Sequence, residues 1–430
     1  GAACSKVGTT SVASGKTFTC IKSGKKLVWD KGVSYSSQPS STKKIYAQPT
    51  QLSDNVEKCK VKENNNNRKG MANTLPSGFP SVTPLTSRTG TSKWALIPID
   101  FPDLKGESKW RSRVDDQMKI LSDWFNTVSE GKFKVEWVVA DNWVTLPKST
   151  AEYAIPNSVN LADAPNGPKL FTDAMKAADP VFNFSGIQTV NFILPKGETF
   201  IGETSQGFPW DEAVKNLVTN EGKISSFSIP GVFMDKPNKD YWGYWAHEFG
   251  HAISIPHVGK SHPPAPLYSG YELMASQDGP TRELDGWLRF VAGWLSDDKI
   301  YCKDSQKLDT IELSLVPLNS ADSGYKLAVV PLSENNAIVM ESRRVNKFSC
   351  NTTPEQNGVL VYTYDGSLSH GEDFLVPIAP EGRPTAYSNC PTPPMIDSLL
   401  RVGDKVSING ITIEVISSDS FDRIKITKKS

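Results

Sequence analysis

Two hydrophobic periodicities alternate along residues 91–300 and predict interleaved strands and helices. Residues Trp94–Ile99 form an apolar run of strand length, and Phe133–Val139 alternate apolar with polar positions, as half-buried strands do. Between them, apolar residues recur at helical spacing from Val114 to Val128, and Gly131 lies just beyond. The same patterns predict a further strand and two further helices, over Thr189–Leu194, Leu170–Ala178 and Asp240–Ser254.

Beyond Trp294 the pattern changes to short apolar runs separated by turns. These strand-like runs lie at Thr310–Leu315, Tyr325–Val330, Ala337–Glu341, Val359–Tyr364 and Ile411–Ile416. We therefore expect an all-β, sandwich-like domain over residues 301–430. No stretch approaches the roughly 18 to 20 consecutive apolar residues that a membrane span needs, so we expect no membrane span.

The amino-terminal part differs in composition from the rest of the chain. Residues 1–33 contain Cys4, Cys20 and two short strand-like runs, and we interpret them as a small disulfide-containing module. Residues 34–90 are rich in Ser, Pro, Thr, Lys and Asn and cannot bury enough apolar surface to fold alone. They are expected to form a linker, or a pro-like extended segment that lies across a neighbour. The predicted fold is α+β and multidomain, with the α/β domain at residues 91–300.

Charge and cysteine content narrow the class of protein. The 47 basic residues balance 47 acidic ones, and no long basic stripe is present, so nucleic acid is not an expected partner. The chain does not begin with a charged stretch followed by an apolar one, and we expect a mature form without its export signal. Six cysteines without a C-x-x-C pair favour three disulfides in an oxidising compartment, and hence a secreted or cell-surface protein.

The disulfide pairing rests mainly on proximity in the sequence. It joins Cys4 to Cys20 and Cys350 to Cys390, and it leaves Cys59 with Cys302 as the remainder. Six cysteines allow about 15 connectivities, so this pairing is one among many. A second use for Cys59 is as a thiolate that ligates the metal of a latent form, because its segment could lie across an active site.

The candidate chemistry lies in the predicted helix over Asp240–Ser254 and the residues that follow it. His247 and His251 are four residues apart, so both rings can direct a nitrogen at one metal ion. Glu248 is offset from them and is placed to act as general base on a metal-activated water. Pro256 ends the helix, and the following turn can return His257 as a third ligand. A fourth position then stays open for water, which is typical of catalytic zinc.

The remaining histidines and two nearby tyrosines receive different interpretations. His262 and His370 are interpreted as surface residues rather than ligands. Tyr271 is the candidate for a phenol that stabilises the developing oxyanion, with Tyr268 as its alternative, although aromatic residues in loops more often pack.

The segment Tyr271–Ala275 matches a Met-turn, the tight turn beneath a metzincin metal site, with Met274 packing under the three imidazoles. A rival assignment takes Glu272 as the third ligand, because a gluzincin glutamate follows the second histidine by about twenty residues. Its surroundings indicate a loop or turn instead of the helix that a gluzincin requires, so His257 is preferred.

The sequence resembles the immune inhibitor A type of bacterial secreted metallopeptidases over about residues 93–365. Ala95–Asp103 (ALIPIDFPD) resembles the opening strand of that family, and Trp124–Leu146 resembles its helix-turn-strand. Glu272–Leu295 resembles its Met-turn and the following helix, while Val339–Arg343 and Gly358–Asp365 resemble the first β strands after the catalytic domain. The resemblance implies a metzincin-like catalytic domain with Zn²⁺. It also implies structural Ca²⁺, for which no EF-hand spacing names the ligands.

Two positions depart from these patterns. Ser254 stands where metzincins usually have a glycine that tolerates positive φ, so the turn is expected to reach His257 by an αR-compatible route. His257 itself follows the metzincin norm at a position where members of the immune inhibitor A family often carry an acidic residue. Separately, Cys4–Trp29 resembles short segments of exported actinobacterial proteins, which implies contact with the cell envelope.

The sequence therefore predicts a secreted zinc endopeptidase that acts on protein or peptide substrates. An exported binding or adhesion protein with the same scaffold and no turnover is the alternative from another functional class. All three histidines and Glu248 are present, and a decayed site usually loses one of them, so the enzyme is favoured.

Overall fold

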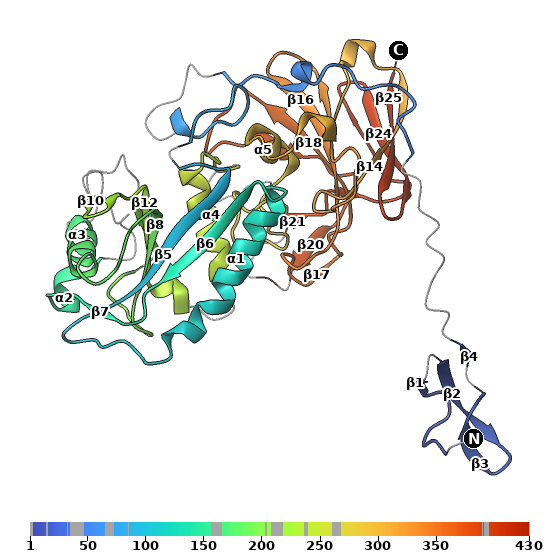
Figure 1. Cartoon of the computed structure of the whole chain (residues 1–430). Helices are drawn as coiled ribbons and strands as arrows, with labels where there is room; N and C mark the ends of the chain where they lie inside the picture. Colours follow the sequence, from blue (N-terminus) through green and yellow to red (C-terminus); the bar gives the residue numbers. More distant parts are fainter. Residues whose placement is uncertain are drawn as a thin grey trace. The chain divides into compact units, whose positions relative to one another are not determined.

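The computed structural model describes two compact units, Gly1–Tyr46 and Ala47–Ser430, and each is treated by itself (Figure 1). The described residues are 3–13, 16–31, 33–34, 47–64, 73–84, 86–155, 166–202, 204–207, 218–235, 240–259, 268–388, 390 and 395–429. The further divisions expected near residues 90 and 300 stay predictions. Among the described residues, no helix has the length and apolar character required to cross a membrane.

The amino-terminal unit is a small antiparallel sheet held by one disulfide. Its strands are β1 (Thr10–Ala13), β2 (Lys16–Ser23), β3 (Lys26–Trp29) and β4 (Val33–Ser34), and β2 pairs with the other three. The Cys4–Cys20 disulfide ties the start of the chain to β2. The surface of this unit is basic, with exposed side chains at Lys6, Lys16, Lys22, Lys25, Lys26 and Lys31. Contact with the cell envelope through this unit stays a prediction.

The large unit contains a six-stranded sheet in the order β6-β5-β8-β12-β9, to which β7 adds at β5. The strands are β5 (Gly90–Asp100), β6 (Phe133–Val139), β7 (Val144–Thr145), β8 (Ile187–Ile193), β9 (Thr204–Gly207) and β12 (Ser226–Pro230). All pairs are parallel except β12 with β9, which gives the sheet one antiparallel edge. The strands expected near residues 94, 133 and 189 are confirmed.

Helices cover both faces of this sheet. Side chains of β5 point alternately to the two faces, so both of its sides are buried against helices. Trp94 and Leu96 belong to the core shared with α1 (Asp115–Val128) and α4 (Tyr241–Ala252). Ala95, Ile97 and Ile99 belong to the core on the other face, which contains α3 (Gly167–Ala178) and the end of α2 (Thr150–Tyr153). Figure 1 shows α3 and α1 on opposite sides of β5 and β8. The predicted helices are thus confirmed, each to within a few residues.

The carboxyl-terminal half contains two further large sheets, as the all-β prediction requires. One has the order β13-β15-β16-β18-β19, with β22 at β18, and the other has the order β14-β25-β24-β23. The first comprises β13 (Ile300–Cys302), β15 (Leu327–Pro331), β16 (Asn336–Arg343), β18 (Gly358–Asp365), β19 (Leu375–Pro377) and β22 (Leu399–Leu400). The second comprises β14 (Thr310–Leu315), β23 (Lys405–Ile408), β24 (Ile411–Ser418) and β25 (Asp422–Lys428).

Several short elements complete the described chain. A three-stranded sheet joins β17 (Thr352–Thr353), β20 (Thr385–Ser388) and β21 (Met395–Ile396), and a hairpin joins β10 (Val218–Thr219) to β11 (Gly222–Lys223). The short helix α5 spans Gly286–Val291. Single 3-10 turns lie at Val56–Cys59, Trp110–Arg113, Val232–Asp235, Asp297–Lys299 and Ser305–Lys307.

The first carboxyl-terminal sheet contributes to two cores. In β16, Ile338 and Met340 share a core with residues of β24 and β25 in the second carboxyl-terminal sheet. The alternate residues Ala337 and Val339 belong to the same core as α1, α4 and α5. One continuous core therefore extends from the first sheet to the β half, which joins the two halves of the large unit.

The segment before β5 lies across the β half. Asp54 donates its backbone N–H to the Cys302 carbonyl over 2.8 Å, and Lys62 donates its backbone N–H to the Glu334 carbonyl over 3.0 Å. The Cys59–Cys302 disulfide fixes the same segment, and Cys350–Cys390 is also formed, so all three expected pairs are confirmed. The interpretation of Cys59 as a thiolate ligand is therefore wrong.

Candidate metal centre

Helix α4 is buried on nearly all sides, and its aromatic residues fix its rotation. Phe249 packs on Trp94 of the sheet with ring centroids 3.9 Å apart, and the Trp245 indole donates to Ser228 Oγ of β12. Asp240 precedes the helix, but its side chain caps no N–H and instead pairs with the Arg282 guanidinium. Asp240 therefore occupies the N-cap position without a side-chain cap, because the arginine takes its carboxylate.

The helix ends in a left-handed turn that leads to His257. Ile255 N–H donates to the Gly250 carbonyl over 2.9 Å, and Ser254 N–H donates to the His251 carbonyl over 3.1 Å. These are the two bonds of a Schellman motif, whose residue after the C-cap takes positive φ. Ser254 occupies that position with φ 68°. The expected αR route is therefore wrong, since serine here adopts the conformation that glycine usually supplies.

Three imidazoles converge at this turn. His247 and His251 are buried, His257 is partly buried, and one ligand atom from each lies within 4.8 Å of the others. Nε2 of His257 is 2.8 Å from Nε2 of His247 and 3.0 Å from Nε2 of His251. A tetrahedral zinc with bonds of about 2.0 to 2.1 Å separates its ligand nitrogens by roughly 3.4 Å, so small ring movements accommodate the ion.

Backbone carbonyls hold the two helical rings in the required orientation. Nδ1 of His247 is 3.0 Å from the Leu273 carbonyl, and Nδ1 of His251 is 2.9 Å from the Ile255 carbonyl. A carbonyl accepts only, so each Nδ1 carries the proton and each Nε2 presents a lone pair. Burial lowers the pKa of His247 to about 4 and that of His257 to about 2. Neutral rings with converging lone pairs suit a divalent cation that prefers nitrogen ligands.

Glu248 lies one residue along the helix from His247. It is partly exposed, and the low polarity of its surroundings raises the pKa of its carboxyl to about 7. A carboxyl in such surroundings gains basicity, which general-base chemistry near neutral pH requires.

Met274 lies beneath the same helix. A Cβ added to Gly250 would meet Met274 Sδ and Cε at 3.0 Å, so the thioether lies against the turn that carries His251. The Met274 carbonyl accepts the Val258 N–H over 3.3 Å, next to His257. With the Leu273 carbonyl against His247, this turn contacts the surroundings of all three histidines.

Glu272 and the two tyrosines are engaged elsewhere. Among the described residues, the three histidines are the only group of three or more side chains close enough to hold one metal ion, and Glu272 is outside it. The buried carboxylate of Glu272 accepts the Ala275 N–H over 2.9 Å, within its own turn. Tyr271 Oη donates to the Ile396 carbonyl over 2.9 Å and accepts the Ser398 N–H over 2.6 Å. Tyr268 is buried, with its ring 5.4 Å from that of Tyr362.

His370 is the residue that sequence reasoning missed. The sequence predicts a surface position for it, yet its ring stacks on that of His257, with centroids 4.9 Å apart and an interplanar angle of 15°. It comes from the segment between β18 and β19, more than a hundred residues after the motif, so no spacing rule connects it to the site. His262 lies outside the described residues.

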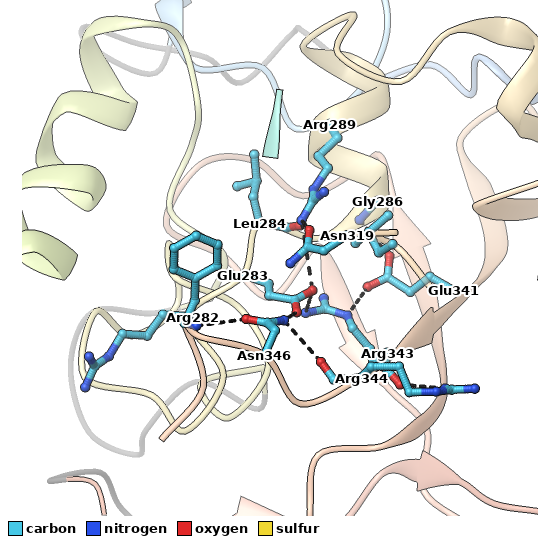
Figure 2. A network of polar contacts seen from close by, with 12 residues as sticks. Arg282, Glu283, Leu284, Gly286, Arg289, Asn319, Glu341, Arg343, Arg344 and Asn346 are labelled. Atoms are coloured by element: carbon cyan, nitrogen blue, oxygen red, sulfur yellow. Dashed lines mark hydrogen bonds and ion pairs between the residues drawn. The ribbon is translucent and has the colours of Figure 1, made fainter. Parts of the chain in front are cut away.

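A buried ionic network surrounds Arg343 of β16 (Figure 2). Arg343 of β16 donates to the Tyr271 carbonyl over 3.0 Å and to Glu283 over 3.1 Å. Its Nε also donates to Glu341 over 2.5 Å, and Glu341 accepts the Gly286 N–H over 2.6 Å. The turn that holds Met274 is thereby attached to the carboxyl-terminal sheet.

No protein-family model matches the sequence, and no curated protein matches it. Metalloproteinase-II from Bacteroides fragilis is similar in structure, with 12% identity and a TM-score of 0.27, covering 51% of this chain and 60% of that protein. OgpA from Akkermansia muciniphila gives 10% identity and a TM-score of 0.28, covering 84% of this chain and 100% of that one. Catalytically inactive OgpA in complex with an O-glycopeptide substrate, glycodrosocin, gives the same identity and TM-score over 79% and 91%. Similarity at this level supports no inference about the activity of this chain.

Proposed function

We propose that the protein is a secreted, zinc-dependent endopeptidase of metzincin type, related to the immune inhibitor A metallopeptidases. The observation that carries the proposal is the convergence of three imidazoles beside Glu248, within a helix and turn that the fold holds from several sides. The three disulfides support an extracytoplasmic location, since such bonds persist in oxidising compartments.

The proposed mechanism divides the work between the histidines and the glutamate. His247, His251 and His257 would hold the ion through Nε2. A bound Zn²⁺ supplies Lewis-acid chemistry that acidifies water and polarises the scissile carbonyl. Glu248 takes the proton of the attacking water at its carboxylate and later gives it to the leaving amine nitrogen. Tyr271 is assigned no step, because its hydroxyl is occupied by main-chain groups.

The test is the replacement Glu248→Gln, followed by metal analysis and by hydrolysis of casein or gelatin with and without a chelator. Gln keeps the size of the side chain and cannot take a proton, so we expect one equivalent of zinc with turnover lowered at least 100-fold. Glu136→Gln serves as the matched control, because Glu136 is an exposed residue of β6. Full activity in Glu248→Gln would contradict the mechanism.

The same assay separates the enzyme from a binding or adhesion protein. An enzyme loses activity in the chelator and in Glu248→Gln but keeps it in Glu136→Gln. A wild-type protein that binds zinc and cleaves neither substrate would favour the binding protein.

A further inference from the structure

The third histidine is held differently from the first two. The ring of His247 is fixed through Nδ1 by the Leu273 carbonyl, and that of His251 by the Ile255 carbonyl. Among the described residues, nothing hydrogen-bonds to Nδ1 of His257, and this residue lies beyond the helix end. Its position must therefore come from contacts with its main chain and with the faces of its ring.

Those contacts are made by the segment Ser369–Glu372, between β18 and β19. The His257 N–H donates to His370 Nδ1 over 2.9 Å, and the two rings stack. The Gly371 N–H donates to the His257 carbonyl over 3.3 Å. The Gly259 N–H donates to the Glu372 carbonyl over 2.9 Å, which extends the contact past the histidine.

This segment has its own supports. The Ser369 N–H donates to the Glu372 carboxylate over 2.8 Å, which closes the turn around His370. Ser77 Oγ donates to the Leu368 carbonyl over 3.0 Å, and the Gly366 N–H donates to the Asn335 carbonyl over 2.7 Å. The segment is therefore joined to the β half through Asn335 and to the stretch before β5 through Ser77.

We propose that His370 is a positioning residue for the third metal ligand, so that the β half takes part in metal binding. The inference rests on the metal site of the proposed function, and it does not depend on turnover. His370 holds the backbone of His257 through Nδ1 and limits the rotation of its ring by stacking. Loss of these contacts leaves the third ligand free to rotate away, and partners of this kind typically change metal affinity about 10- to 100-fold.

The test measures the dissociation constant of zinc by competition with a chromophoric chelator, using the full chain. We expect about 10-fold weaker binding in His370→Ala. His370→Asn should recover most of the affinity, because the amide oxygen of Asn can accept the His257 N–H from nearly the position of Nδ1. His370→Gln places its amide near Nε2 and should not recover it. Ser367→Ala, at an exposed position two residues before this segment, is the control with unchanged affinity.

The visible absorption of the cobalt-substituted protein provides a second readout. Cobalt bands report coordination geometry, so His370→Ala should change them while His370→Asn keeps the wild-type spectrum. Equal zinc affinity in wild type, Ala, Asn and Gln variants would overturn the inference. If the four proteins bind zinc equally but His257→Ala binds it more weakly, the three-histidine site of the proposed function is supported. Only the positioning role of His370 is then refuted. A wild-type chain without zinc affinity would overturn both proposals.

Discussion

Ser254 combines two local costs within one residue. Its φ of 68° is in the left-handed region, which costs an L-residue roughly 1 to 2 kcal/mol relative to its usual conformations. Its buried Oγ has no hydrogen-bond partner among the described residues. The turn that delivers His257 is thus formed against the intrinsic preference of the residue at its centre, and the surrounding contacts compensate.

Replacing this serine by glycine should stabilise the protein. In Ser254→Gly the strain and the unpaired hydroxyl both disappear, and we expect the free energy of unfolding in urea to rise by about 1 kcal/mol. Ser254→Ala retains the strain and loses only the hydroxyl, so its gain should be smaller. Equal stability of the Gly and Ala variants would contradict the strain argument. Zinc affinity should be unchanged in both.

Glu198 predicts a pH dependence of stability. Burial raises the pKa of its carboxyl from 4.5 to about 7, although Phe200 and Ile201 both donate N–H groups to it. Between these values the native state binds more protons than the unfolded state, so this residue lowers the free energy of unfolding as pH rises from about 4.5 to about 7.

The measurement is urea denaturation at several pH values, comparing the wild type with Glu198→Gln. Gln keeps an oxygen for the two N–H groups and carries no charge. We expect the free energy of unfolding of Glu198→Gln to fall less than that of the wild type as pH rises from about 4.5 to about 7. The two proteins should differ little at about pH 4. A steeper decline in the variant would show that the ionised carboxylate is stabilising.

At the scale of elements, α4 is fixed between the sheet on one side and the segment Met274–Gln277 on the other. Phe249 packs on Trp94 of the sheet. On the other side, the helix backbone at Gly243 lies close to the backbone of Gln277. Gly243 makes that approach, because a Cβ at this position would lie 2.8 Å from the Gln277 carbonyl oxygen. The distance between the helix and this segment therefore depends on a missing side chain.

Gly243→Ala tests this close approach. Alanine favours a helix by about 1 kcal/mol over glycine, yet overpacking against backbone costs about 1 to 3 kcal/mol. We expect a net loss of about 1 kcal/mol in the free energy of unfolding, together with weaker zinc binding as α4 moves. Lys119→Ala, an exposed position of α1, controls for helix propensity. A more stable Gly243→Ala variant would show that the backbone at Gln277 moves away from the added methyl group at little cost.

At the scale of the whole large unit, charged groups are buried where the two halves meet. Arg343 is fully buried and contacts Glu283, Glu341 and the Tyr271 carbonyl. Removing one member of a buried ion pair leaves its partners as uncompensated charges. This network therefore makes the stability of the turn around Tyr271 depend on the carboxyl-terminal sheet.

Arg343→Met should lower the free energy of unfolding by about 3 to 5 kcal/mol, measured by chemical denaturation. Arg423→Met is the matched control, because Arg423 forms an ion pair with Glu312 in which both side chains are partly exposed. Such surface pairs contribute about 0 to 1 kcal/mol. A loss below 1 kcal/mol in Arg343→Met would indicate that the network relaxes or hydrates once the guanidinium is gone.

The sequence by itself determined the features that depend on local periodicity. Alternation located the strands around Trp94 and Phe133, and helical spacing placed His247 and His251 on one side of α4. The histidine spacing also predicted the approach of His257, which the turn at residue 254 delivers. These features could be read from a short window because neighbouring residues fix them.

Only the tertiary structure decided which distant groups meet. The αL conformation of Ser254, the ion pair of Asp240 with Arg282 and the placement of Tyr271 depend on packing that no local pattern encodes. His370 is the clearest case, since it reaches His257 from the β half across 113 residues of chain. Contacts of this range are set by how sheets and helices pack, and packing depends on the shapes of all the surfaces involved at once.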